Sequence, residues 1–291
     1  MSETGEMNIK PNIQILKDTA AIIYIDADHA FGPVVTVRAM KQAIEKAKQA
    51  GIGWCLIRNV THQGAIGYYS LMAAKADMAG IAIACNPPNM APYGAKAKGL
   101  HNSPISIAIP AKRHRPVLLD MATSVAAGGK LSLAIDKGIP IPEGWAIDKD
   151  GNPATDPRQA TTLLPFGGPK GSGLAMMFEC LTSIMANNPL VVPSLMDEPQ
   201  SRRHTQNSVV AAINIGIFSD TEIYKNHVDT FIDCLKDLPK ADGFDEIFVP
   251  GELEDRCYDE RMKNGIPLPD GTIQNLKSIS QKLDVALPDG L

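Results

Sequence analysis

The chain has 291 residues, of which 44% are apolar and 21% are charged, and its formal net charge is −4 at pH 7. This composition is typical of a globular protein that can bury a sizeable core. The weakly acidic balance contains no basic stripe, and no apolar run is long enough to cross a bilayer. We therefore expect no nucleic acid and no membrane among the partners of this protein.

The cysteines and histidines are scattered along the chain. The five cysteines are Cys55, Cys85, Cys180, Cys234 and Cys257. None has the close spacing of a zinc or redox motif, and no histidine has a partner at metal-ligand spacing, so we expect no metal. An odd, dispersed set of cysteines is typical of a reducing compartment, and the opening MSETGEMNIK lacks the apolar core of a signal peptide. We expect a cytoplasmic protein.

Apolar runs alternate with helical patterns in the first third of the chain. Three continuous apolar runs predict buried strands: 20–25, 54–57 and 80–85. The turn formers at 26–33 are expected to end the first strand. Helical spacing predicts a helix that stops at Gly51 and a second helix over 69–77. Strands that alternate with helices in this way predict an α/β sheet that is covered on both faces.

Two long Pro- and Gly-rich loops follow, at 86–104 and 137–169. Long loops in a compact domain tend to carry function. Further strands are predicted at 105–109, 117–119 and 209–213, and helices within 124–136, near 252–263 and near 272–284. No internal repeat or clean linker divides the sequence. We expect a single unit over residues 1–291, built from two interleaved lobes.

Two further helices have distinct signals. Leu174, Met177, Leu181 and Ile184 fall at helical spacing and predict the packed face of one helix, and Met176 with Met177 is expected in the core. The pattern from Ser219 to Glu222 matches a capping box and predicts the start of the other, with Glu222 bonding back to the cap backbone.

His62 is the first candidate for chemistry. It follows an apolar strand and precedes a helix, at the carboxyl end of a strand where open α/β sheets bind ligands. The positive end of the helix dipole favours a neutral imidazole, and Gln63-Gly64 leaves room for a ligand. Such a ring could take a hydroxyl proton as hydride leaves the same carbon. The alternative is a loop histidine that bonds a backbone carbonyl.

Lys170 and Asp120 are the next candidates. Lys170 stands among glycines, where the start of a helix offers N–H groups to a pyrophosphate or a carboxylate; the alternative is a surface turn with a solvated lysine. The loop matches neither the Walker A pattern nor GxGxxG. Asp120 ends an apolar strand and could cap a helix or bind a ribose or amide.

Six sequence blocks together resemble the type 2 malate/L-lactate dehydrogenase family over nearly the whole chain. The blocks are NVTHQGA at 59–65, MAPYG at 90–94, LDMATS at 119–124, IPEGWAID at 141–148, LPFGGPKG at 164–171 and FVPGE at 248–252. Two stretches, 64–69 and 168–171, look most like the ureidoglycolate dehydrogenases of this family, and sulfolactate dehydrogenases also belong to it.

This resemblance implies a large mixed sheet with helices on both faces and a nicotinamide-binding fold that is not of the Rossmann type. It implies NAD or NADP as the cofactor, a small-molecule substrate, and a homodimer or higher homo-oligomer. It implies His62 as the catalytic acid/base. It also implies that the cofactor is contacted by Asn86, Asp120, Met121, Ala122, Lys170, Gly251, Glu252 and Leu253.

The chain departs from the family at two places. It reads HNSP at 101–104 where relatives usually read Gly-Thr-Asn-Pro, which bears on the contacts of that loop. Relatives also carry several dozen preceding residues with a Ser-His-Gly motif and an arginine that holds the substrate carboxylate. Either the sequence is shortened or the groups are lost, and without the arginine we expect poorer orientation of the substrate.

Three functions remain open from the sequence. The first is an oxidoreductase that transfers a hydride between NAD(P) and a small 2-hydroxy or 2-oxo acid such as malate, lactate or ureidoglycolate. The second is a cofactor-binding relative with impaired catalysis. The third is a reductase of a cyclic imino acid.

Overall fold

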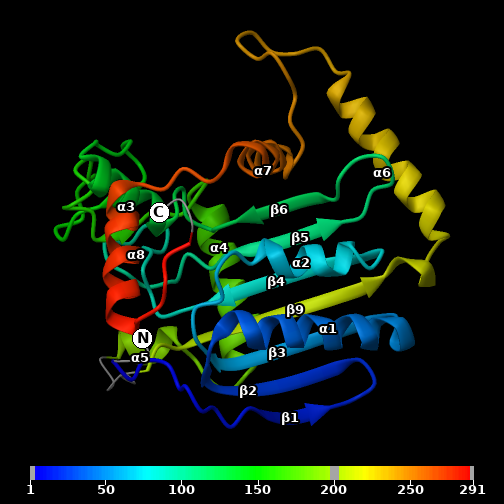
Figure 1. The fold of residues 1–291 in the computed structure, drawn as a ribbon, viewed down its shortest axis with the longest axis horizontal. Coiled ribbons are helices and arrows are strands. Elements are labelled where there is room, and N and C mark those ends of the chain that lie inside the picture. Colours follow the sequence, from blue (N-terminus) through cyan, green and yellow to red (C-terminus); the bar gives the residue numbers. More distant parts are fainter. Residues whose placement is uncertain (1–3, 197–202, 289–291) are drawn as a thin grey trace.

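The computed structural model describes residues 4–196 and 203–288, and its centre is one seven-stranded mixed sheet with the order β1-β2-β3-β9-β4-β5-β6 (Figure 1). The strands are β1 (Gln14–Asp18), β2 (Ile22–Ala30), β3 (Ile52–Val60), β4 (Met78–Cys85), β5 (Ile105–Ile109), β6 (Val117–Met121) and β9 (Gln206–Asn214). Only β2 and β3 run parallel among these neighbours; the other pairs are antiparallel. The predicted α/β class with a large mixed sheet is confirmed.

Helices cover both faces of the sheet. Helices α1 (Gly32–Ala50) and α2 (Gly67–Ala74) pack on one face, and α4 (Pro169–Glu179) with the π-helical turn η1 (Cys180–Ile184) contacts the other. The remaining helices are α3 (Gly128–Lys137), α5 (Val191–Leu195), the short 3-10 turn η2 (Ile215–Ile217), α6 (Thr221–Lys236), α7 (Glu252–Asn264) and α8 (Asp270–Leu283). A two-stranded sheet, β7 (Ala146–Ile147) with β8 (Thr162–Leu163), lies in the second long loop. Within 4–196 and 203–288, no helix combines the length and apolarity needed to cross a membrane.

The main core lies between the sheet and α1. It is rich in alanine on the helix side and in isoleucine and valine on the strand side. A Cβ on Gly53 would lie 1.9 Å from the carbonyl oxygen of Ala43, so only glycine lets α1 approach β3 this closely. The helix ends as predicted at Gly51, which has a φ of 83° and donates its N–H to Ala47.

The expectation that residues 26–33 end the first strand is wrong. β2 continues to Ala30, and its ladder with β3 shifts register between Asp26 and Ala30. Asp28 and His29 take left-handed φ values of 47° and 56°, so the turn-forming residues make an irregularity inside the strand.

The predicted packed face of α4 and η1 is also wrong. Leu174, Met177 and Ile184 are 39%, 49% and 50% exposed, and Met176 is 56% exposed. The buried side chains belong to the next stripe around the helix: Ala175, Phe178, Glu179 and Thr182. A helix with apolar residues along two stripes of its surface can pack either stripe against the sheet. Here the stripe with Ala175 and Phe178 is buried, and the stripe with Leu174 and Met177 is exposed.

Helix α6 begins one residue later than the predicted capping box. Its N-cap is Asp220, whose Oδ1 accepts the N–H of Ile223 at 2.9 Å. Glu222 does not bond back to the cap; it pairs with Lys225 and Lys112. Both ends of α7 and of α8 agree with the sequence prediction within a few residues.

Candidate functional site

A cavity of about 470 Å³ lies at the end of the sheet where β3, β4 and β6 finish and where β5 and β9 begin. This volume is in the range that binds small molecules. Five predicted site residues line it together: His62, Asn86, Asp120, Met121 and Ala122. They arrive from three strand ends that are far apart in sequence, and the fold brings these five residues together at one cavity.

The backbone on both sides of His62 is fixed by buried hydrogen bonds. Thr61 is 1% exposed, and its Oγ1 donates to the carbonyl of Ala30 and accepts the N–H of Gly32. Gln63 is 2% exposed, and its Nε2 donates to the hydroxyls of Thr36 and Ser208 at 2.7 and 2.8 Å. The loop therefore holds His62 between two anchors, and the room expected for a ligand at Gln63-Gly64 lies at Gly64, where a Cβ would meet nothing within 4 Å.

The start of α1 presses directly on this loop. A Cβ on Gly32 would lie 2.4 Å from the carbonyl oxygens of both Thr61 and His62. The hydroxyl of Tyr69, from α2, donates to the carbonyl of Gln63. Two helices and two strands thus position one imidazole, which is the rigid support that an acid/base group requires.

The His62 ring is exposed and accepts the N–H of Gly64 on Nδ1 at 3.0 Å. A neutral ring in this position carries its proton on Nε2. If the ring exchanges its proton through Nε2, Nδ1 is protonated both before and after the exchange. A protonated Nδ1 cannot accept the N–H of Gly64, so this contact has to open when the ring acts. The ring has the freedom to do so because Gly64 stands in open space.

Asp120 caps a helix, although not one that follows it in the sequence. Its Oδ2 accepts the N–H of Gly67 at 2.8 Å, at the start of α2. Desolvation raises the pKa of the Asp120 carboxyl, Glu254 raises it further, and the Gly67 N–H acts in the opposite direction. The carboxyl therefore ties the end of β6 to the helix that follows the His62 loop.

A second histidine lines the cavity but is held neutral. His101 is 8% exposed; its Nε2 lies 3.2 Å from Nδ2 of Asn86, and its Nδ1 lies 3.3 Å from the hydroxyl of Ser103. Burial lowers the pKa of His101 to about 3, with His204 and His62 adding to the effect. Because both ring nitrogens are engaged, His62 is the better acid/base candidate of the two.

The remaining predicted residues do not line this cavity in the described parts of the chain. Lys170 is the second residue of α4 and is exposed, after Gly167 and Gly168 at φ values of 54° and 59°. Residues 251–253 border the edge of β6, where Leu118 donates its N–H to the carbonyl of Pro250. Their proposed contacts with a cofactor stay predictions.

Sequence reasoning missed three residues at the cavity. Gln63 and Gln206 support the His62 loop, and His101 orients Asn86. No sequence pattern indicated Gln206, because the apolar run that predicted this strand covers only 209–213. The strand β9 begins three residues earlier, at Gln206. Extending a predicted strand to its first polar residues could have found it.

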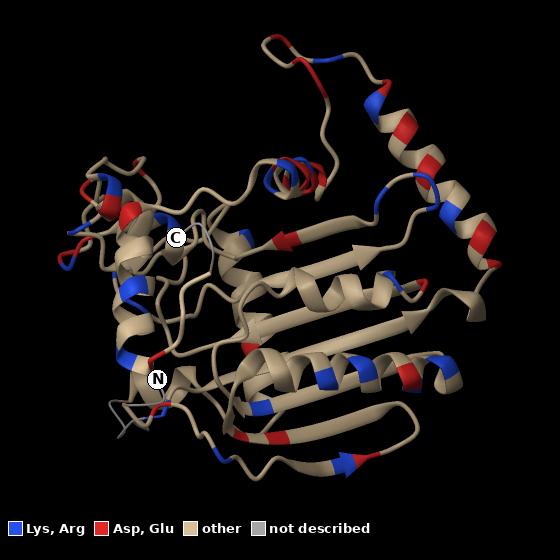
Figure 2. Ribbon diagram, in the orientation of Figure 1, with Lys and Arg blue, Asp and Glu red and all other residues tan. Residues whose placement is uncertain are grey.

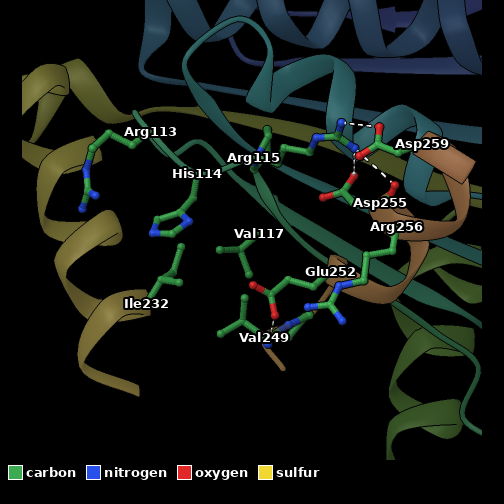
Figure 3. A pocket seen from close by; sticks show the side chains of 12 residues that line it. Arg113, His114, Arg115, Val117, Ile232, Val249, Glu252, Asp255, Arg256 and Asp259 are labelled. Carbon is green, nitrogen blue, oxygen red and sulfur yellow. Dashed lines mark hydrogen bonds and ion pairs between the residues drawn. The ribbon is translucent and has the colours of Figure 1, made fainter. Parts of the chain in front are cut away.

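A second pocket, of about 280 Å³, lies between the β5–β6 hairpin, α6 and α7 (Figure 3). Its charged groups are paired with one another. Arg113 contacts Asp229 and Asp233, and Arg115 contacts Asp255 and Asp259. Figure 2 shows the charges crowded on α6 and α7, while the central strands carry few.

Comparisons with known proteins agree with this architecture. The family model for malate/L-lactate dehydrogenase matches residues 1–277. An L-sulfolactate dehydrogenase of Methanocaldococcus jannaschii is 42% identical over 98% of this chain and 82% of its own length. A ureidoglycolate dehydrogenase (NAD(+)) of Escherichia coli O157:H7 is 32% identical over 94% of this chain and 79% of its own length.

A solved structure of malate dehydrogenase from Entamoeba histolytica superposes with a TM-score of 0.93 at 29% identity, covering 99% of this chain and 84% of that one. The sulfolactate dehydrogenase structure from Methanocaldococcus jannaschii superposes with a TM-score of 0.83 at 40% identity, over 97% and 82% of the two chains. The extent of these matches and of the family model shows that the chain belongs to the malate/L-lactate dehydrogenase family.

Proposed function

We propose that this protein is an NAD(P)-dependent dehydrogenase that interconverts a small 2-hydroxy acid and its 2-oxo acid, with His62 as the acid/base. The observation that carries the proposal is the cavity at the sheet end, where an exposed imidazole stands between two buried backbone anchors. The relatives named for sulfolactate, malate and ureidoglycolate all oxidise small hydroxy acids.

The cavity residues fit the reactive end of a nicotinamide cofactor with a small acid. The volume of about 470 Å³ suits one ring and a small substrate. Asn86 offers a carboxamide whose Oδ1 has no partner among the described residues, and Met121 and Ala122 border the same space. When bound, the cofactor would supply or accept the hydride.

The protein itself would handle the proton. In the oxidative direction His62 takes the hydroxyl proton, and in the reductive direction it returns that proton to the carbonyl oxygen. The anchors at Thr61 and Gln63 keep the ring at the cavity while the Gly64 contact opens. Asn86, Asp120 and the glycine-rich start of α4 with Lys170 are proposed to hold the cofactor, together with Gly251, Glu252 and Leu253.

A substrate panel tests this proposal. Purified protein is mixed with NADH or NADPH, and the loss of absorbance is followed with oxaloacetate, pyruvate, oxalurate, sulfopyruvate and a cyclic imine. We expect turnover of at least one 2-oxo acid with one of the two cofactors. Absence of turnover and of cofactor binding across the panel would contradict the proposal, and turnover of the imine alone would replace the 2-oxo acid as the substrate class.

We also propose that the protein forms a homodimer. On the sheet face opposite α1, an apolar groove of about 520 Å³ is lined by residues of β1, β2 and β3, including Tyr24 and Trp54, and by Met185, which follows η1. Ile22, Ile52 and Met185 at this face are 46%, 40% and 54% exposed. Monomers rarely leave such patches open. Light scattering should give twice the chain mass of 31.2 kDa, and Met185→Glu should lower that mass; a monomeric wild type would contradict the dimer.

A further inference from the structure

Gln206 is one of the residues that line the cavity at the sheet end. It is the first residue of β9, the strand between β3 and β4. The ladders pair Gln206 with Val60 on one side and Asn207 with Cys85 on the other. The two neighbouring strands therefore lead, within two residues, to His62 and to Asn86, and Gln206 stands between them.

The orientation of the Gln206 amide is fixed by its neighbour. Its Oε1 accepts the backbone N–H of Gln63 at 3.2 Å. A backbone N–H can only donate, so the oxygen has to be on that side and the Nε2 group on the other. The side chain is 4% exposed and lines the cavity, yet no described residue accepts a hydrogen bond from Nε2. The amide is therefore held by its oxygen and leaves its donor group towards the cavity, where a ligand oxygen can accept from it.

The charges of the cavity indicate what this donor would meet. Among the described lining residues there is no lysine or arginine, and Asp120 is the one carboxylate. An oxygen of an anionic substrate would thus depend on uncharged donors in this part of the site. A hydrogen bond to a charged oxygen contributes more than one between neutral groups.

We infer that Gln206 is a substrate-binding residue: Nε2 donates to a carboxylate or carbonyl oxygen of the 2-oxo acid beside His62, while Oε1 holds the His62 loop through Gln63. The inference rests on the proposed function. It assigns one side chain two tasks, so that binding of the substrate oxygen and placement of the imidazole are linked through a single amide.

The substitution Gln206→Glu separates the two tasks. Glutamate has the same shape and keeps an oxygen to accept the Gln63 N–H, but it replaces the donor with a negative oxygen. We expect kcat/KM for the 2-oxo acid to fall about a hundredfold, mainly through a higher KM, because a donor to the substrate becomes a repelling charge. The dissociation constant for the reduced cofactor, measured by fluorescence, and the melting temperature should stay near the wild-type values.

Two further variants complete the experiment. Gln159→Glu makes the same chemical change on an exposed side chain that does not line the cavity, and it should leave all parameters unchanged. Gln206→Met removes the donor and the loop anchor together, so both the melting temperature and kcat/KM should fall.

The outcomes distinguish this inference from the proposed function. If the wild type reduces a 2-oxo acid and Gln206→Glu keeps kcat/KM within twofold, Gln206 only supports the loop and the inference is overturned alone. If Gln206→Glu weakens cofactor binding as strongly as it raises the substrate KM, the assignment to substrate is also wrong. If the wild type neither binds a nicotinamide cofactor nor reduces any 2-oxo acid, the proposed function fails and the inference fails with it.

Discussion

The charged pocket and the cavity at the sheet end use polar groups in opposite ways. The pocket between the β5–β6 hairpin and α6 and α7 is rich in arginine and carboxylates, and each arginine in it is paired: Arg113 with Asp233, Arg115 with Asp259 and Arg256 with Glu246. The cavity at the sheet end has few charges, but it presents an exposed imidazole and a free amide donor.

This difference shows that charge density does not mark the functional site here. Paired charges at a surface contribute little to stability individually, but they can hold surface elements in place. Hydrogen-bonding groups that line a cavity on a rigid support, and that no other side chain uses, are available to orient a ligand. The cavity with few charges is therefore the candidate site for the reaction, and we expect the ion pairs of the charged pocket to hold surface elements together. The predictions below test that contrast.

The largest effect is expected at His62. His62→Ala should lower kcat for the 2-oxo acid by about 10²–10⁴-fold, the usual contribution of a general acid/base, while cofactor binding is kept. The matched control is His114→Ala in the charged pocket, where the imidazole pairs with Asp233; it should leave kcat within twofold. Equal losses of kcat in the two variants would contradict the assignment of the reaction to the cavity at the sheet end.

Gly32→Ala should displace the His62 loop through its contact with the start of α1. The new methyl group would lie 2.4 Å from two carbonyl oxygens of the His62 loop, so α1 or the loop has to shift. We expect a loss of about 1–3 kcal/mol in unfolding free energy and a lower kcat. Gly271→Ala, near the start of α8, where a Cβ meets nothing within 4 Å, is the control; it should leave kcat unchanged and should not lower the unfolding free energy. Wild-type kcat in Gly32→Ala would show that the loop tolerates displacement.

Asp229→Asn tests the structural pocket. This carboxylate is 1% exposed and accepts the N–H groups of Lys112, Arg113 and His114 from the hairpin. We expect a loss of about 1–3 kcal/mol in unfolding free energy with unchanged kcat, measured by denaturant unfolding and by the turnover assay. A loss of activity without a loss of stability would place chemistry in the charged pocket.

The effect of Asp229→Asn should also depend on pH. Burial raises the pKa of Asp229, but the three backbone N–H groups and Arg113 outweigh it, so the pKa is lowered from 3.8. The stabilisation is then fully present above pH 3.8 and is lost as the pH falls through the folded value. The difference between wild type and variant should shrink in that acid range; a constant difference would contradict the pKa direction.

The smallest effect at neutral pH is expected for His101→Gln. The pKa of His101 is lowered from 6.5 to about 3, so between these values the unfolded chain binds a proton that the folded chain does not. The unfolding free energy of the wild type should therefore fall as the pH is lowered from 6.5 towards 3. Glutamine should reduce this slope, as measured by denaturant unfolding at several pH values. An unchanged slope would show that His101 is not held neutral.

Most central strands and the main helices could be predicted because local sequence patterns determine them, whereas β1 was missed and β2 was predicted too short. The apolar runs at 54–57 and 80–85 lie in β3 and β4, and Gly51 ends α1 as expected. The packed stripe of α4 could not be predicted, since apolar side chains on two stripes make the choice depend on the sheet below.

Long-range pairing also limited the prediction of the site. The role of Gln206 depends on β9 lying between β3 and β4, which are more than 120 residues away in the sequence. The helix that Asp120 caps likewise begins 53 residues before it. Local patterns identify the type of side chain at a strand end, but only the sheet order decides which ends meet.

The most direct test of the central claim is a crystal structure of the protein with bound NADH or NADPH, whichever the turnover assay selects. We predict that the nicotinamide ring lies in the cavity at the sheet end, beside His62 and Gln206, with the charged pocket free of it. A nicotinamide ring bound among Arg113, Arg115 and Arg256 would contradict the account.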